Sequence, residues 1–273
     1  MARLDFSFLK KIANVQKWLE NFGDAFLGFL EDTGGIVVLF WKTIVMTVSK
    51  TPRWYSTLEQ SFKIGVLSLP LVMLTSLFTG MVLCLQSAYQ LRIFAAEQFT
   101  ADLVALSVTR ELGPVLTAMM VAGRVGASMA AELGTMKVTE QIDALDSLAT
   151  NPIHFLVVPR FIATVSMLFL LTIYADLIGM LGGFLVAVFK LGISQYIYIN
   201  RSFSALVMKD IYTGLIKSVV FGVIISIVGC YYGFKARGGA EGVGHATTMA
   251  VVVSFILIIV FDTFFTALFY FVF

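Results

Sequence analysis

The chain has 273 residues, of which 59% are apolar and only 13% are charged. A soluble domain carries about 25% charged residues because its surface faces water, so this composition excludes an ordinary soluble enzyme and indicates a protein solvated mainly by lipid. The formal net charge of +2 is too small to favour nucleic acid as a partner. Cys84 and Cys230 each lie inside an apolar run, where a buried thiol is expected rather than a disulfide.

The first 50 residues are expected to lie at the membrane surface. Apolar side chains recur there every three or four residues with lysines on other faces, which predicts an amphipathic helix in the headgroup plane; a short soluble helix that packs on a partner is the alternative. Residues 36–48 are apolar but short and contain Lys42, which favours a re-entrant or interfacial helix. No cleavable signal pattern is seen, so we expect the N-terminus to be retained. The amphipathic positions are Phe8, Ile12, Val15, Leu19, Phe22 and Phe26.

Five later segments are long and apolar enough to cross a bilayer. A helix needs about 20 residues to cross a ~30 Å hydrocarbon core, and backbone groups in lipid find hydrogen bonds only within a helix or a closed barrel. The predicted fold class is an all-α membrane protein with five transmembrane helices, preceded by amphipathic and re-entrant interfacial helices in residues 1–50. The predicted membrane domain is 51–273, with spans at about 64–86, 107–131, 161–189, 211–234 and 247–273.

The distribution of Lys and Arg near the span ends indicates the orientation. Four basic residues between positions 42 and 63 place this region and the N-terminus in the cytoplasm, so that five spans bring the C-terminus to the periplasmic side. The loops 87–106, 132–160 and 234–246 agree with this arrangement. The loop 190–210 conflicts with it, because it carries three basic residues and falls outside.

The second predicted span combines small residues with charges. Small side chains recur every four positions from 118 to 130, a spacing that lets helices approach closely in lipid. Arg124 lies within this run, and an intramembrane arginine needs a partner, a wet cavity or a route to the interface. We favour a structural role for it. The candidate partners are Glu132, Asp176 and Asp262.

Other intramembrane polar residues leave two interpretations open. Arg110 and Glu111 open the second span just before Gly113-Pro114, either as an interfacial pair or as the mouth of a cavity in which Arg110 meets a phosphate. Asp176 and Asp262 could relay protons or form helix-to-helix hydrogen bonds, of which we favour the second. Lys217 is a further charge inside a predicted span. His154 and His245 stand apart without metal-ligand spacing, so no metal site is expected.

The segment at about 136–149 predicts a short helix after the second span. Its apolar positions, Ile142, Leu145 and Leu148, are expected to face inward, and Asn151-Pro152 ends it. An acidic amphipathic helix between two spans has the form of a docking element; an inert loop is the alternative. The predicted surface positions are Glu140, Asp143 and Asp146.

Six stretches place polar residues in a hydrophobic frame: RELGP at 110–114, AGRVGASMAAELGTMKVTEQIDAL at 122–145, NP at 151–152, PRFIA at 159–163, GLIKSVVFG at 214–222 and DTFFTAL at 262–268. Together they resemble the MlaE/YrbE family of ABC-transporter permeases, which serve MCE-type lipid transport systems. The resemblance covers about 50–273, and the N-terminus follows it only loosely.

The resemblance implies a homodimer in the inner membrane that moves phospholipid or a related lipid. It also implies a cytoplasmic ABC ATPase, an MCE-domain protein (hexameric) on the opposite face and a STAS-like accessory protein. The helix at 136–149 would be the coupling helix on the ATPase, and lipid would sit between the two subunits. Gln90 departs from the apolar cavity wall that the family pattern implies. The implied lipid-binding residues are Leu83, Leu91, Arg110, Glu111 and Leu112.

The chain contains no G-x-x-x-x-G-K-[ST] loop, and Gly214 with Lys217-Ser218 resembles one only superficially. We therefore expect no catalytic residue and no cofactor in this chain, with ATP and Mg bound by the partner ATPase. The alternative is an ion-coupled secondary transporter with Asp176 and Asp262 as carriers. Such transporters usually have inverted repeats around a midplane site, and no repeat is visible in the sequence.

Overall fold

The computed structural model describes the backbone of residues 6–272 and the side chains of residues 23, 27–28 and 30–271. The chain divides into two compact units, Met1–Lys42 and Thr43–Phe273. The amphipathic face predicted for the N-terminal helix lies outside the described side chains, so it stays a prediction.

The N-terminal segment forms one continuous helix, α1 (Phe6–Ser49). Residues 36–48 are the last part of this helix, so the separate re-entrant helix that we expected is not confirmed. Its portion Leu30–Ser49 has a mean hydropathy of 1.2 and is 20 residues long, enough to cross a membrane. The described residues thus hold six helices of sufficient length and apolarity, against the five spans predicted.

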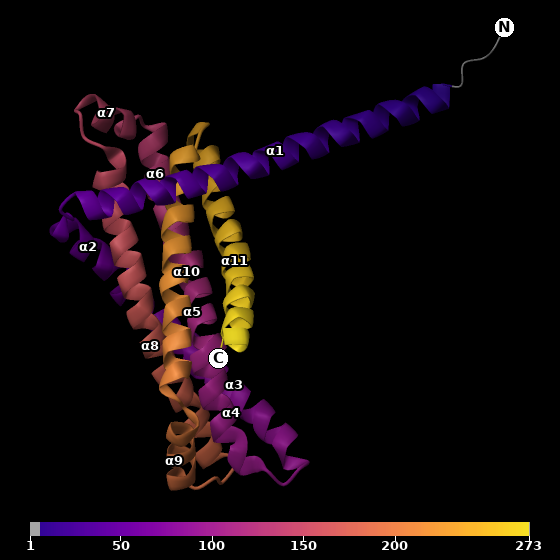
Figure 1. Ribbon diagram of the computed structural model, residues 1–273, viewed down its shortest axis with the longest axis vertical. Coiled ribbons are helices and arrows are strands. Elements are labelled where there is room, and N and C mark those ends of the chain that lie inside the picture. Colours follow the sequence, from indigo (N-terminus) through magenta and orange to yellow (C-terminus); the bar gives the residue numbers. More distant parts are fainter. Residues whose placement is uncertain (1–5, 273) are drawn as a thin grey trace. The chain divides into compact units, whose positions relative to one another are not determined.

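Helices and the turns that join them make up the second unit in the part of the chain that the structure describes. Figure 1 shows α8 and α10 running side by side along its length, with α7 at one end and α9 at the other. Its helices are α2 (Trp54–Ile64), η1 (Val66–Ser68), α3 (Leu69–Arg92), η2 (Glu97–Phe99), α4 (Thr100–Ser107), η3 (Val108–Leu112), α5 (Gly113–Val121), η4 (Ala122–Gly126), α6 (Ala127–Val138), α7 (Gln141–Ser147), η5 (Ile153–Val157), α8 (Val158–Phe189), α9 (Gln195–Ala205), α10 (Met208–Lys235) and α11 (Gly239–Val272).

The long helices extend beyond the predicted spans because hydropathy marks only the part that lies in hydrocarbon. The first two run over Trp54–Arg92 and Glu97–Val138, so most of the predicted loop 87–106 is helical. The predicted loop 190–210 also contains a helix, α9, which hydropathy missed. The sequence of α9 is polar on average, but its Tyr198 is buried against neighbouring helices.

Glycines bring α3 and α8 into backbone contact. A Cβ atom at Gly80 would collide with the carbonyl oxygen of Gly179, and one at Gly182 would collide with the carbonyl oxygen of Leu77. Lipid supplies no hydrophobic drive for helix association, so such close van der Waals packing has to hold the pair together.

An apolar cluster fixes α9 against α3, α4 and α8. Tyr198 is 3% exposed within it, and burial raises the pKa of its hydroxyl above the usual range, which keeps the phenol neutral. Beside the cluster, Arg201 Nη1 donates to Asp102 Oδ2 at 3.0 Å, and its guanidinium carbon lies 4.2 Å from the centre of the Phe99 ring. The buried members are Cys84, Ala101, Val104, Val108, Val186, Ala187 and Tyr198.

Replacing Gly80 with Ala should destabilise the protein by about 1–3 kcal/mol, because the added Cβ must separate two packed backbones. The matched control is Gly123→Ala, where the new Cβ would meet only the Phe255 ring at 3.8 Å. Thermal unfolding in detergent should show a lower Tm for Gly80→Ala and an unchanged or higher Tm for Gly123→Ala. Equal Tm values would contradict the close-packing assignment.

Candidate functional site

In the described part of the chain, three π-helical turns interrupt the helices around polar residues of the sequence motifs. In each, the N–H after the turn bonds five residues back: Gly113 to Val108, Ala127 to Ala122 and Val158 to Ile153. Such turns are rare and frequently mark functional sites. The first carries Arg110 and Glu111.

The first π-helical turn, η3, directs a backbone carbonyl toward α10. Gly113 donates its N–H to Val108, and Pro114 has no N–H to donate, so the Thr109 carbonyl lacks its usual helical donor. This oxygen lies against Gly214, where a Cβ atom would collide with it. The absence of a side chain at position 214 therefore lets η3 touch the α10 backbone.

Arg110 is paired with a buried carboxylate at the beginning of α10. Its Nε and Nη2 lie 2.8 and 2.6 Å from Asp210 Oδ1. Asp210 Oδ2 also accepts the Val207 N–H at 3.1 Å, so Asp210 caps its own helix and is only 2% exposed. The Arg110 side chain remains 50% exposed.

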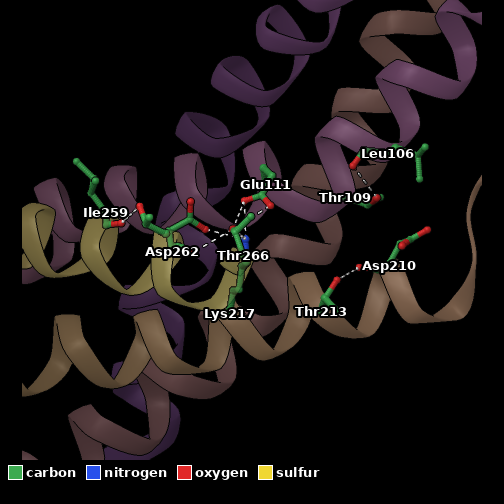
Figure 2. Close-up of polar contacts among 10 residues, drawn as sticks. Leu106, Thr109, Glu111, Asp210, Thr213, Lys217, Ile259, Asp262 and Thr266 are labelled. Atoms are coloured by element: carbon green, nitrogen blue, oxygen red, sulfur yellow. Dashed lines mark hydrogen bonds and ion pairs between the residues drawn. The ribbon is translucent and has the colours of Figure 1, made fainter. Parts of the chain in front are cut away.

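Two turns farther along α10, Lys217 is 1% exposed and lies among oxygen atoms from two other helices. Figure 2 shows its side chain directed at Glu111 of η3 and at Asp262 and Thr266 of α11. Lys217 Nζ lies 2.5 Å from Glu111 Oε2, 2.9 Å from Asp262 Oδ1 and 2.8 Å from Thr266 Oγ1. The Thr266 hydroxyl also contacts both Glu111 carboxylate oxygens, at 3.1 and 3.2 Å. We call these four residues the lysine cluster.

A cavity of about 300 Å³ opens beside the lysine cluster. Charged and hydroxyl groups line one side, whereas the last turns of α11 supply aromatic rings. Such a cavity can accept an amphiphilic molecule with an anionic head. The lining residues are Arg110, Glu111, Lys209, Asp210, Thr213, Lys217, Thr266, Phe269 and Tyr270.

The structure brings together only part of the predicted site. Arg110 and Glu111 line the cavity, and Lys217 and Asp262 meet beside it. Leu83 packs instead against the apolar cluster under α9. Leu112 lines a different, water-sized hollow between α3, α5 and α8. Leu91 is half-buried near the end of α3. Lipid contact by these three leucines stays a prediction.

The predicted partners of Arg124 are wrong. Its Nη1 donates to Ser68 Oγ at 2.6 Å and approaches the Lys63 carbonyl at 3.4 Å, so Arg124 caps the end of α2. Glu132 pairs with Arg160, and Asp262 belongs to the lysine cluster. The Asp176 carboxylate lies against Gly113, and its buried Oδ1 has no hydrogen-bond partner among the described residues.

The predicted helix at 136–149 is divided into two elements. α6 continues to Val138, and α7 begins only at Gln141 after Glu140, which has a φ of 62°. Ile142 is buried as expected, but Leu148 is 75% exposed, because α7 ends before it and the chain turns. Asp143 and Asp146 are exposed, and Asp143 Oδ1 lies 2.8 Å from Lys137 Nζ.

The sequence patterns did not single out Asp210 and Thr266 as site residues. Their spacing gives the signal that could have found them. Asp210, Gly214 and Lys217 share one face of a helix at intervals of four and three residues, and Thr266 follows Asp262 by one turn. Polar residues that share one face of an apolar span indicate a facing polar partner.

The fold and the charged site define a class: a multi-pass membrane protein with an embedded polar cavity and no nucleotide-binding loop, as in the permease subunit of a transporter. The comparison with known proteins agrees. The Permease MlaE family matches residues 57–268, and the chain belongs to this family of ABC transporter permeases. The family resemblance of the sequence motifs is thereby confirmed.

Relatives from three kinds of organism extend over most of the chain. A probable ABC transporter permease of Rickettsia typhi is 48% identical over 227 residues, 83% of this chain and 88% of the relative. One from Synechocystis is 45% identical over 205 residues, 75% and 78% of the two chains. The protein TRIGALACTOSYLDIACYLGLYCEROL 1, chloroplastic, of Arabidopsis thaliana is 40% identical over 227 residues, 83% of this chain and 65% of the relative. These comparisons identify an ABC transporter permease and not the alternative considered from the sequence, an ion-coupled secondary transporter.

Replacing Lys217 with Met should lower the free energy of unfolding by about 3–5 kcal/mol, because it leaves two carboxylates in a membrane-embedded cluster without their cation. Adding Glu111→Gln and Asp262→Asn to Lys217→Met should recover most of the lost stability. The exposed Lys190→Met is the control for loss of a lysine. Thermal unfolding checks the order of the variants; a triple variant as unstable as Lys217→Met contradicts the charge-pairing argument.

Proposed function

We propose that this permease moves phospholipid or a related lipid between the inner membrane and the outer envelope. In this proposal two copies form a homodimer with lipid between them, a separate cytoplasmic ATPase supplies the energy, and an MCE-domain protein, hexameric in form, receives or delivers lipid on the opposite face. A STAS-like protein is a further partner. The N-terminus lies in the cytoplasm and the C-terminus in the periplasm, which requires that α1 stays at the membrane surface and that the other five apolar helices cross.

The cavity beside the lysine cluster is the observation that carries this proposal. A membrane-embedded cavity lined by ions on one side and by Phe269 and Tyr270 on the other matches the two-part chemistry of a phospholipid. A small inorganic ion would gain little from the aromatic side. The Arabidopsis relative is named after a glycolipid, which supports a lipid as the substrate.

Arg110 is the best-placed group for an anionic headgroup. Only Nε and Nη2 of its guanidinium are used by Asp210, the side chain is half exposed, and it lines the cavity. Guanidinium groups suit phosphate because they present several donors in one plane. Lys217 is paired with Glu111 and Asp262, so its role in this proposal is to stabilise the cavity wall. Recognition of the ligand is the role of Arg110.

The end of the molecule that carries α7 is the proposed docking site of the ATPase (Figure 1). Glu140, Asp143 and Asp146 are exposed there, and a hollow of about 320 Å³ lies beside Asp146 and Ile142. Because the chain has no phosphate-binding loop of its own, ATP and Mg belong to the partner, and this chain needs no cofactor.

Replacing Arg110 with Gln should reduce the phospholipid that co-purifies with the protein about tenfold, because a charge-assisted hydrogen bond to phosphate is worth about 1.5–3 kcal/mol. Asp210 keeps its bond to the Val207 N–H, so the helix cap survives. Arg92→Gln is the matched control, since this side chain is 81% exposed and pairs with Glu97. Native mass spectrometry measures the bound lipid; equal lipid in both variants would overturn headgroup binding by Arg110.

Charge reversal on α7, with Glu140→Lys and Asp143→Lys together, should abolish co-purification of the partner ATPase. The surface would then repel any partner that binds it through basic groups. Glu97→Lys, in η2 after the outer end of α3, is the control for adding a lysine. Undiminished ATPase in the pull-down of the double variant would remove α7 from the interface.

A further inference from the structure

The segment that carries α7 is an excursion of the chain between the two helices α6 and α8, which we call its stems. It leaves the membrane domain at the end of α6, Val138, and returns at the beginning of α8, Val158. A backbone joint lies on each side of α7, at Glu140 with a φ of 62° and at Ala149 with a φ of 56°. Non-glycine residues rarely adopt this left-handed conformation, so α7 is connected to both stems through unusual turns rather than continuous helix.

The two stems, α6 and α8, each pack extensively on α10. Glycines make this possible on the α6 side. A Cβ atom at Gly229 would lie 3.1 Å from the Gly126 carbonyl oxygen, and one at Gly233 would lie 2.7 Å from the Leu133 Cβ. Cys230 is fully buried at the same level. Main-chain packing thus ties each stem to α10.

One ion pair joins the stems directly. Arg160 Nη2 donates to Glu132 Oε2 at 3.0 Å, across from α8 to α6. The Arg160 side chain is only 9% exposed, and its Nη1 also donates to the Leu156 carbonyl at 2.9 Å, within the π-turn η5. A single guanidinium therefore holds α6, the first turn of α8 and the irregular turn that leads back from α7.

The burial of this guanidinium requires an explanation. A nearly buried arginine is costly unless it is paired, and a short loop between two helices does not need one to fold. What the pair adds is rigidity between the stems below the two joints. A force on α7 can then either bend the chain at Glu140 and Ala149 or move α6 and α8 together. The Glu132–Arg160 pair favours the second outcome.

We propose that the Glu132–Arg160 pair is a brace that transmits movement of α7 to the membrane helices, so that both residues are positioning residues for transport. The inference rests on the proposed function, because it needs an ATPase that moves α7. The pair lies far along the chain from the lysine cluster and takes no part in binding the lipid. Its loss should therefore uncouple ATP hydrolysis from transport while leaving bound lipid and ATPase docking unchanged.

The test uses the full chain with its ATPase and other partners, reconstituted in phospholipid vesicles that contain a fluorescent phospholipid. Glu132→Ala removes the carboxylate that pairs with Arg160, and alanine, the best helix former, keeps the helical propensity of α6. ATP hydrolysis should stay within about twofold of the native rate, and lipid moved per ATP should fall about tenfold, as expected for loss of a part-buried charge pair. Glu132→Gln, which keeps an acceptor oxygen, should give an intermediate ratio.

Two further variants make the outcome specific. Glu97→Ala breaks the exposed pair with Arg92 and should leave the ratio unchanged. Arg160→Lys combined with Glu132→Ala should lower the ratio no further than Glu132→Ala alone, since residues that act as a unit are not additive. Hydrolysis and transport that fall in the same proportion, or a ratio equal to the native one, would overturn the brace. Failure of the native complex to bind ATPase or move lipid would instead refute the proposed function.

Discussion

A nearly buried lysine on α10 dictates how the second half of this permease is arranged. Lys217 is 1% exposed within a membrane helix, and leaving it unpaired there would cost several kcal/mol. Glu111 and Asp262 have to approach it, so η3 and α11 are drawn to the same side of α10. The cavity next to them follows from this convergence, and so does the position of Arg110, the neighbour of Glu111 in the chain.

Hydropathy and residue spacing predicted the helical class, the membrane location and the charged residues of the second span. They did not predict the helix ends, because helices continue past the apolar stretch that hydropathy marks, as the end of α3 shows. They also missed α9, whose sequence is polar. Hydropathy and residue spacing also did not predict which charged residues pair with one another. Arg124 could have paired with any of three carboxylates, and it caps α2 instead, since helix rotation and the π-turns decide which way each side chain faces.

The polar groups of the permease separate into two systems with different tasks. The lysine cluster and Arg110 surround the proposed lipid cavity, whereas Glu132 and Arg160 hold the stems of α7. Both systems are assembled on α10, which contributes Lys217 toward one end and the packing surface of Gly229 and Gly233 toward the other. The single helix α10 thus connects the α7 end of the second unit, where we propose that the ATPase docks, with the proposed lipid cavity.

The contact at Gly214 limits how the cavity can change its shape. The Thr109 carbonyl already touches the α10 backbone there, so η3 and α10 are at their minimum separation and this pair of walls can open but cannot draw closer. Any tightening around a ligand has to come from the α11 wall, which consists of Thr266, Phe269 and Tyr270. One wall of the cavity is therefore fixed against closure, whereas the other can move. Headgroups of different size would be accommodated by displacement of α11.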